Sequence, residues 1–325
     1  MPLNEFALIR QYFTGLGRSE DGGDGVALGV GDDCALLDVP EGQQLAVTVD
    51  TLVAGVHFPR DAAPEDIARR SLRVNLSDLA AMGAQPRWFT LALTMPNADA
   101  SWLEAFAAAL ADDACQFGCA LVGGDTTAGP MTISVQMMGL VPRGQALTRA
   151  GAKEGDRVYV TGTLGEGAAA LQLFEPNPSL PESVKHELLG RFYRPAPRLR
   201  EGVILCGLAS AAIDISDGLL ADLGHIAECS GLGAEVELSR LPLAPWLAEL
   251  ATSRQIQEWA LSGGDDYELC FTVPEILCVE VDRLIASGDL MATRIGRMTR
   301  GNGVSCVDAA GQSVSVVGTG YQHFQ

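Results

Sequence analysis

Lysine is nearly absent from this chain, since Lys153 and Lys185 are the only two among 325 residues. Neither lies in the pattern G-x-x-x-x-G-K-[ST] of a Walker A loop, and the strand lysine, H-R-D and D-F-G motifs of protein kinases are also missing. A bound nucleotide phosphate would then be neutralised by metal ions, by backbone amides of glycine turns and by arginines such as Arg149. The scarcity of lysine therefore excludes both lysine-based phosphate sites.

Long apolar runs and paired cysteines are missing as well. No run approaches the roughly 18 to 20 residues of a membrane-spanning helix, and the first residues lack a basic region followed by an apolar block. The eight cysteines include no CxxC pair, and Cys115 and Cys119 are spaced by one helical turn in apolar surroundings. We expect a cytoplasmic protein with no membrane contact, no disulfide and no zinc.

Basic residues are few beside acidic ones, with 22 against 41 and a formal net charge of −19. Such a charge repels nucleic acid, so a nucleic-acid partner is not expected. Hydrophobic residues make up 47% of the chain, which excludes disorder, and the length predicts two domains. The acidic excess either solvates the surface or gathers carboxylates that hold divalent cations.

The segment LRVNLSDLAAMGAQP, Leu72 to Pro86, is the centre of the predicted organisation. Its apolar residues recur at helical spacing and predict one buried helix face: Leu72, Leu76, Leu79, Ala80 and Met82. Gly83 and Pro86 predict the helix end. Asp78 lies on another face, and alone it is equally consistent with a solvated helix residue.

Five further aspartates follow hydrophobic strand-like segments together with Gly, Ser or Thr: Asp33, Asp50, Asp125, Asp214 and Asp217. One such strand end is ordinary turn chemistry, but the recurrence predicts that the five converge with Asp78 on one cleft. Oxygen ligands suit hard divalent cations, and magnesium combines a few carboxylates with water and substrate phosphates. The pattern therefore indicates magnesium–nucleotide chemistry.

The alternation of strands and helices predicts an α/β or α+β fold with domains 1–148 and 149–325. In the first half we expect helices at 3–13 and 102–117, a loop at 19–25, and strands at 26–30, 35–39, 45–49, 88–94, 119–122 and 132–141. In the second half we expect strands at 157–162, 211–215 and 269–273, an Ala-rich helix after Gly167 and a helix at 219–230. The segment 162–167 lacks G-x-G-x-x-G, which argues against a Rossmann domain.

Ordered motifs along essentially the whole chain resemble one family, the thiamine-monophosphate kinases of the aminoimidazole ribonucleotide synthetase superfamily. They are GDDCAL at Gly31, TVDTLVAGVHF at Thr48, VNLSDLAAMGAQP at Val74, GGDTT at Gly123, ALTRAGAKEGD at Ala146, AIDISDGL at Ala212, LSGGDDYELCFTVP at Leu261 and the ending GYQHF. The resemblance implies ATP-dependent conversion of thiamine monophosphate to thiamine diphosphate by direct γ-phosphoryl transfer. It also implies a homodimer in which the sheets of the N-terminal domains form a barrel, each followed by a C-terminal α/β domain.

The same resemblance implies roles for individual residues. The magnesium ligands would be Asp33, Thr48, Val49 through its backbone, Asp50, Asp78, Asp125, Asp214 and Asp217. ATP would contact Gly124, Asp125, Arg149 and Ser216, and thiamine monophosphate would contact His57, Asp265 and Tyr321. No side chain is expected to act as a general base, because a phosphate nucleophile is already ionised near neutral pH.

Two positions depart from the family pattern and leave alternatives open. Asp265 stands where the family commonly has glutamate, and Val49 stands where it frequently has threonine. Tyr321 could stack on the cationic thiamine or anchor the C-terminal segment, and His57 could contact substrate or serve only its loop. Another ATP-using enzyme of the superfamily, or a non-catalytic acidic metal-binding or interaction protein, is the alternative function.

Overall fold

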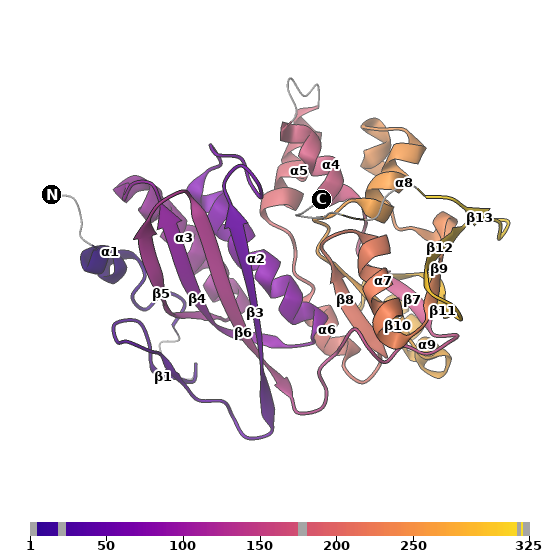
Figure 1. Ribbon diagram of the computed structural model, residues 1–325, viewed down its shortest axis with the longest axis horizontal. Coiled ribbons are helices and arrows are strands. Elements are labelled where there is room, and N and C mark those ends of the chain that lie inside the picture. Colours follow the sequence, from indigo (N-terminus) through magenta and orange to yellow (C-terminus); the bar gives the residue numbers. More distant parts are fainter. Residues whose placement is uncertain (1–4, 19–23, 175–180, 317–319, 321–325) are drawn as a thin grey trace. The chain divides into compact units, whose positions relative to one another are not determined.

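The computed structural model describes residues 5–18, 24–174, 181–316 and 320 (Figure 1). They form two compact units, each described by itself below. The first unit comprises residues 1–79 and 84–144, and the second comprises residues 80–83 and 145–325. The boundary predicted between residues 148 and 149 stays a prediction. Among the described residues no helix is both long and apolar enough to cross a membrane.

The first unit contains a four-stranded sheet with helices α2 and α3 on one side (Figure 1). Its elements are α1 (Glu5–Tyr12), β1 (Val26–Leu28), β2 (Leu36–Leu37), β3 (Gln43–Val53), α2 (Pro64–Ala81), β4 (Gln85–Met95), α3 (Ala100–Phe117), β5 (Ala120–Ala128) and β6 (Thr132–Pro142). The strand order is β3-β6-β4-β5, and β4 and β5 are parallel while the other pairs are antiparallel. Strand β3 is therefore an edge strand, eleven residues long.

Helix α2 confirms the predicted central helix and extends it toward the N-terminus. Pro64 opens it with Glu65 and Asp66 in the first turn, where an acidic side chain interacts favourably with the helix dipole. Leu72, Leu76, Leu79 and Ala80 are each at most 1% exposed, as their spacing predicts. The assignment of Met82 to the buried face is wrong, because the helix ends at Ala81 and Met82 is 36% exposed.

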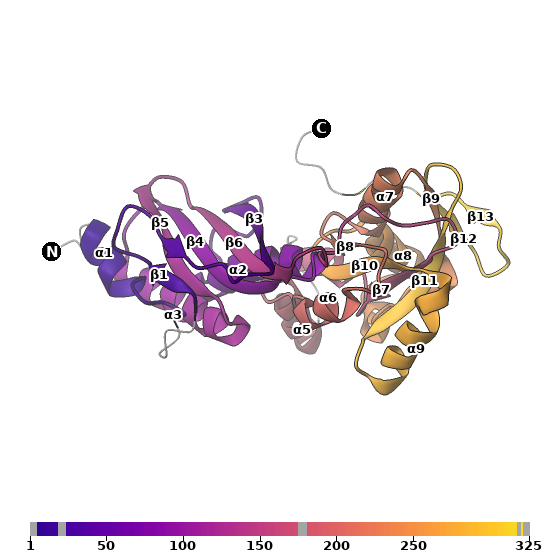
Figure 2. The same ribbon diagram turned by 90° about the horizontal axis from the view of Figure 1, so that it is seen from below.

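The second unit is a seven-stranded mixed sheet covered on both faces. Its elements are β7 (Arg157–Thr161), α4 (Glu166–Ala170), η1 (Leu171–Phe174), α5 (Glu182–Tyr193), α6 (Leu199–Leu205), β8 (Ala211–Ile215), α7 (Leu219–Ser230), β9 (Gly233–Glu237), η2 (Leu238–Arg240), η3 (Pro245–Glu249), α8 (Ser253–Ser262), β10 (Glu268–Val273), η4 (Glu275–Leu277), α9 (Cys278–Ser287), β11 (Ala292–Thr299), β12 (Gly303–Val307) and β13 (Ser313–Val314). The strand order is β13-β12-β9-β11-β7-β10-β8. Figure 2 shows α7 and α9 on opposite sides of this sheet.

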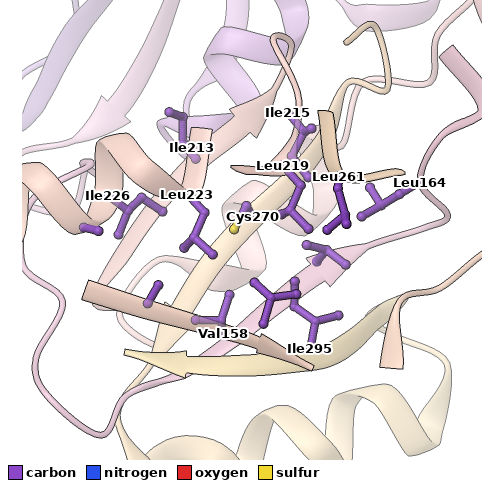
Figure 3. Close-up of a cluster of buried hydrophobic side chains, with 14 of the residues drawn as sticks. Val158, Leu164, Ile213, Ile215, Leu219, Leu223, Ile226, Leu261, Cys270 and Ile295 are labelled. Carbon is purple, nitrogen blue, oxygen red and sulfur yellow. The ribbon is translucent and has the colours of Figure 1, made fainter. Parts of the chain in front are cut away.

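Alternate residues of the central strands supply the two cores of this unit. Val158 and Cys270 belong to the cluster drawn in Figure 3, which also includes Leu223 of α7. Tyr159 and Phe271 point to the other face and stack with ring centroids 5.4 Å apart. Strands buried on both faces read as continuous apolar runs, which explains why β7, β8 and β10 were predictable from sequence.

Two strands are longer than their residue patterns predict. Strand β3 continues through Val53 and β5 continues through Ala128, so Asp50 and Asp125 lie within strands and not at strand ends. Pairing with β6 and β4 sustains these segments despite their Gly, Asp and Thr content. The predicted helix after Gly167 is only the five-residue α4. The predicted loop at 19–25 lies mostly outside the described residues.

Candidate functional site

In the first unit, predicted site residues lie where β3 faces helix α2. The Thr48 hydroxyl donates a hydrogen bond to Oδ2 of Asp78. The backbone amide of Asp50 donates to Oδ1 of Asn75 at 3.1 Å, and the fully buried Asn75 side chain donates to the Ser71 carbonyl at 3.0 Å. These contacts fix the strand against the helix. Asp78 is thus a partly buried residue and not a solvated one.

Asp50 and Asp78 form a pair of like charges at this place. Burial, and secondarily the charge of Asp78, raise the pKa of Asp50 to about 6. A divalent cation would relieve this repulsion, and the carboxylate and hydroxyl oxygens present are the ligands that magnesium prefers. Within the part of the chain that the structure describes, however, no three His, Cys, Asp or Glu side chains gather closely enough to hold a metal ion.

Asp33 and Asp125 are exposed residues of the same unit. Asp33 lies between β1 and β2, where its amide donates to Oδ1 of Asp32 at 2.8 Å. Asp125 lies in β5, directly after Gly124. Gly124 has φ +155°, and a Cβ there would lie 1.9 Å from the Leu91 carbonyl oxygen, so only glycine allows β4 and β5 to approach this closely. The structure brings Thr48, Asp50 and Asp78 together but gathers neither Asp33 nor Asp125 with them into a metal-binding group of three.

His57 occupies the loop after β3 and has partners of its own. Its Nδ1 accepts a hydrogen bond from the Val53 amide at 3.0 Å, and its carbonyl accepts one from Nε of Arg70 at 3.1 Å. An accepting Nδ1 places the proton of the neutral imidazole on Nε2. His57 therefore stabilises its own loop through Nδ1. Its contact with the substrate stays a prediction.

In the second unit, predicted site residues lie in the turn from β8 into α7. Asp214 is 4% exposed and pairs with Leu269 in the sheet, while Ser216 and Asp217 follow in the turn. The backbone amides of Ser216, Asp217 and Gly218 each donate to Oδ2 of Asp222 at 3.1 Å. Burial, followed by the charge of Asp217, raises the pKa of Asp222 to about 7, against the effect of the three amide donors.

Asp222 was missed by the sequence reasoning. The available signal was an acidic residue four positions after Gly218, in the first turn of the predicted helix.

The segment that carries Asp265 is bonded to this same turn. The Asp265 amide donates to the Ser216 carbonyl at 2.9 Å, and the Tyr267 amide donates to the Ile215 carbonyl at 2.8 Å. Asp265 and Tyr267 have φ of +68° and +52°, which strains residues that carry a Cβ. The Tyr267 hydroxyl donates to Oδ1 of Asp265 at 2.8 Å, a partner that the sequence did not predict.

The neighbouring acidic residues of the GGDDYE motif have structural roles. The Asp266 carboxylate accepts hydrogen bonds from the amides of Gly165 at 2.8 Å and Gly167 at 3.0 Å. The buried Glu268 carboxylate accepts two hydrogen bonds from Arg198 and one from the Thr161 hydroxyl at 2.6 Å. These contacts hold the strained segment in place at Asp266, between its two strained residues, and at Glu268, directly after them.

The remaining predicted contacts are Arg149 and Tyr321. Arg149 is exposed in the segment between β6 and β7. Tyr321 lies outside the described residues. Both assignments stay predictions.

Comparison with known proteins decides the family. Residues 31–141 match the N-terminal domain, and residues 153–309 the C-terminal domain, of the AIR synthase related proteins. Thiamine-monophosphate kinase of Escherichia coli strain K12 is 46% identical over 325 residues, which cover 100% of this chain and 99% of that protein. The chain belongs to the thiamine-monophosphate kinase family.

Solved thiamine-monophosphate kinase structures share this fold. The enzyme from Stenotrophomonas maltophilia K279a is 45% identical, with a TM-score of 0.85 over 97% of this chain and 99% of that chain. AaThiL complexed with AMPPCP and TMP is 33% identical, with a TM-score of 0.77 over 100% of this chain and 99% of that one. The predicted two-domain α/β fold of the superfamily is confirmed.

Proposed function

We propose that this protein transfers the γ-phosphoryl group of ATP to the phosphate of thiamine monophosphate and so forms thiamine diphosphate. The observation that carries this proposal is the 46% identity, over the full chain, to a thiamine-monophosphate kinase. The AaThiL complex supports the choice of substrates, because it holds thiamine monophosphate together with AMPPCP, an analogue of ATP. We place the reaction in the cytoplasm, where ATP is available.

The chemistry of the donor groups supports magnesium at the metal positions. We assign as ligands Asp33, Thr48, Val49 through its carbonyl, Asp50, Asp78, Asp125, Asp214 and Asp217. Bound magnesium would neutralise phosphate charge in a chain that has only two lysines to do so. Few carboxylates need to gather around each ion, since magnesium fills its other positions with water and substrate phosphates.

The chain's own residues bind and orient the two substrates in this proposal. Gly124, Asp125, Arg149 and Ser216 contact ATP, with Arg149 supplying a cation to its phosphates. His57, Asp265 and Tyr321 contact thiamine monophosphate. The Asp265 carboxylate, held by the Tyr267 hydroxyl, offsets the charge of the thiazolium ring. The acceptor phosphate is already ionised, so these residues position it and none removes a proton.

A homodimer whose N-terminal sheets combine into a barrel belongs to the same proposal. Strand β3 is an edge strand that pairs only with β6 in the four-stranded sheet. Its side chains Leu45, Val47 and Val49 are 42%, 52% and 59% exposed. A long apolar edge of this kind is a template for association, and a second copy of the chain offers the matching surface.

Formation of ADP and thiamine diphosphate tests the proposed reaction. Purified protein with ATP and magnesium should form both products in equal amounts when thiamine monophosphate is added. Unphosphorylated thiamine should give neither, because it lacks the phosphate nucleophile. ADP release that does not depend on thiamine monophosphate would indicate another ATP-using enzyme of the superfamily, and magnesium binding with no ADP would indicate a non-catalytic protein.

A further inference from the structure

We propose that Asp222 is a positioning residue that holds the turn Ser216–Gly218 in the shape needed by both substrates. The inference rests on the proposed function, which places Ser216 at ATP and Asp217 at magnesium. Asp222 itself touches neither substrate in this proposal. It acts through the backbone of the turn that presents those two residues.

Three hydrogen bonds to a single oxygen carry the inference. Oδ2 of Asp222 accepts the amides of Ser216, Asp217 and Gly218, each at 3.1 Å, and the residue is 2% exposed. Three successive amides that converge on one point impose a concave backbone, as in the turns that bind anions. Here the anion is a side chain of the protein, so the turn is formed before any ligand binds.

Helix α7 fixes the position of this carboxylate. The Asp222 amide donates to the Gly218 carbonyl at 3.0 Å, which closes the first helical turn. The positive end of the helix dipole also favours a carboxylate in this turn. The turn is consequently bonded at both its amide and carbonyl groups to one residue of the helix.

The opposite side of the turn is closed by the segment 262–265. A Cβ on Gly264 would lie 2.5 Å from the Ser216 carbonyl oxygen, and that oxygen accepts the Asp265 amide at 2.9 Å. Ser216 therefore joins Asp222 through its amide and Asp265 through its carbonyl. Loosening the turn at Asp222 should disturb the ATP contact at Ser216 and the thiamine contact at Asp265 together.

The test compares Asp222→Asn with Glu228→Gln in the full-length protein. Asparagine keeps the shape of the side chain but loses the charge that strengthens all three hydrogen bonds. Glu228 lies in the last turn of the same helix and is exposed, so its variant controls for loss of one negative charge on α7. Hydrogen–deuterium exchange is measured without metal or nucleotide, followed by the KM for each substrate.

We expect exchange of the peptide covering residues 214–220 to accelerate on the order of 10-fold in Asp222→Asn, with residues 223–230 unchanged. The KM for ATP and the KM for thiamine monophosphate should both rise by a similar factor, and Glu228→Gln should match the wild type.

Unchanged exchange of the peptide covering residues 214–220 would overturn the inference. So would faster exchange with both KM values unchanged, because Asp222 would then only cap the helix. A wild type without kinase activity would refute the proposed function, while the exchange comparison would still decide whether Asp222 holds the turn.

Discussion

Replacing Asp78 with asparagine should nearly abolish phosphoryl transfer and at the same time stabilise the metal-free protein. The substitution keeps the shape of the side chain, and its amide oxygen can still accept the hydrogen bond from the Thr48 hydroxyl. A neutral amide coordinates magnesium poorly, so turnover is lost. It also removes the charge that opposes ionisation of Asp50.

The size of the stability gain follows from Asp50. Its pKa is raised from 3.8 to about 6, and this corresponds to at most roughly 3 kcal/mol of penalty on its ionised form. Burial is the larger cause and the charge of Asp78 the smaller one. Asp78→Asn should therefore recover the smaller part, on the order of 1 kcal/mol.

The raised pKa of Asp50 also determines how the stability gain of Asp78→Asn changes with pH. A carboxyl whose pKa is raised on folding costs nothing below its unfolded pKa of 3.8, where it is protonated in both states, and its full penalty applies above about pH 6. The gain from Asp78→Asn should thus be present at pH 7.5 and absent near pH 4.

Urea unfolding of chelator-treated protein at both pH values measures the stability gain, and turnover at saturating magnesium measures the activity. Glu104→Gln, an exposed charge loss on α3, is the matched control. Wild-type turnover in Asp78→Asn would refute the ligand assignment. A loss of stability at pH 7.5 would refute the electrostatic argument.

Other predictions concern ligand binding, packing and assembly. Magnesium with ATP should raise the Tm in calorimetry more than either alone, and an equal rise with a non-coordinating salt of matched ionic strength would exclude a specific site. Asp265→Ala and Tyr321→Ala should each raise the KM for thiamine monophosphate roughly 5- to 150-fold with little change for ATP, and the reverse pattern would show that the substrate binds elsewhere. Gly124→Ala should lower the free energy of unfolding by roughly 1 to 3 kcal/mol, because its Cβ would lie 1.9 Å from the Leu91 carbonyl oxygen, and urea unfolding measures this loss. Val47→Asp should convert a dimer to a monomer in sedimentation velocity, since Val47 is 52% exposed on the edge strand, and an unchanged sedimentation coefficient would exclude this interface.

Local patterns predicted most of the elements because each carries its own signal. Helix α2 combines a 3.6-residue apolar period with a stop at Gly83, whose φ of +66° favours glycine. The buried strands of the second unit are short apolar runs bounded by turn residues. These features depend on residues that are neighbours in the chain, so they can be recognised in the sequence without knowledge of the fold.

The features that the sequence did not predict depend on residues that are neighbours in space and not in the chain. The ends of β3 and β5 are set by pairing with β6 and β4, which overrides the poor strand propensity of glycine and aspartate. The role of Asp222 requires a turn that points three amides at one oxygen, and no residue pattern shows that geometry. The positive φ at Tyr267 is likewise invisible in a residue that normally avoids it.

The two faces of β3 have a consequence for how this protein can evolve. Thr48 and Asp50 face helix α2, while Val47 and Val49, the residues between and beside them, are exposed on the other face. Because side chains alternate along a strand, one inserted or deleted residue would exchange these faces, placing valines against Asp78 and the Asp50 carboxylate on the apolar face. Point substitutions can change each face separately, but a change of length by an odd number of residues within β3 would alter the proposed metal site and the proposed subunit interface together. We therefore expect natural length variation by an odd number of residues in this family to fall outside this strand.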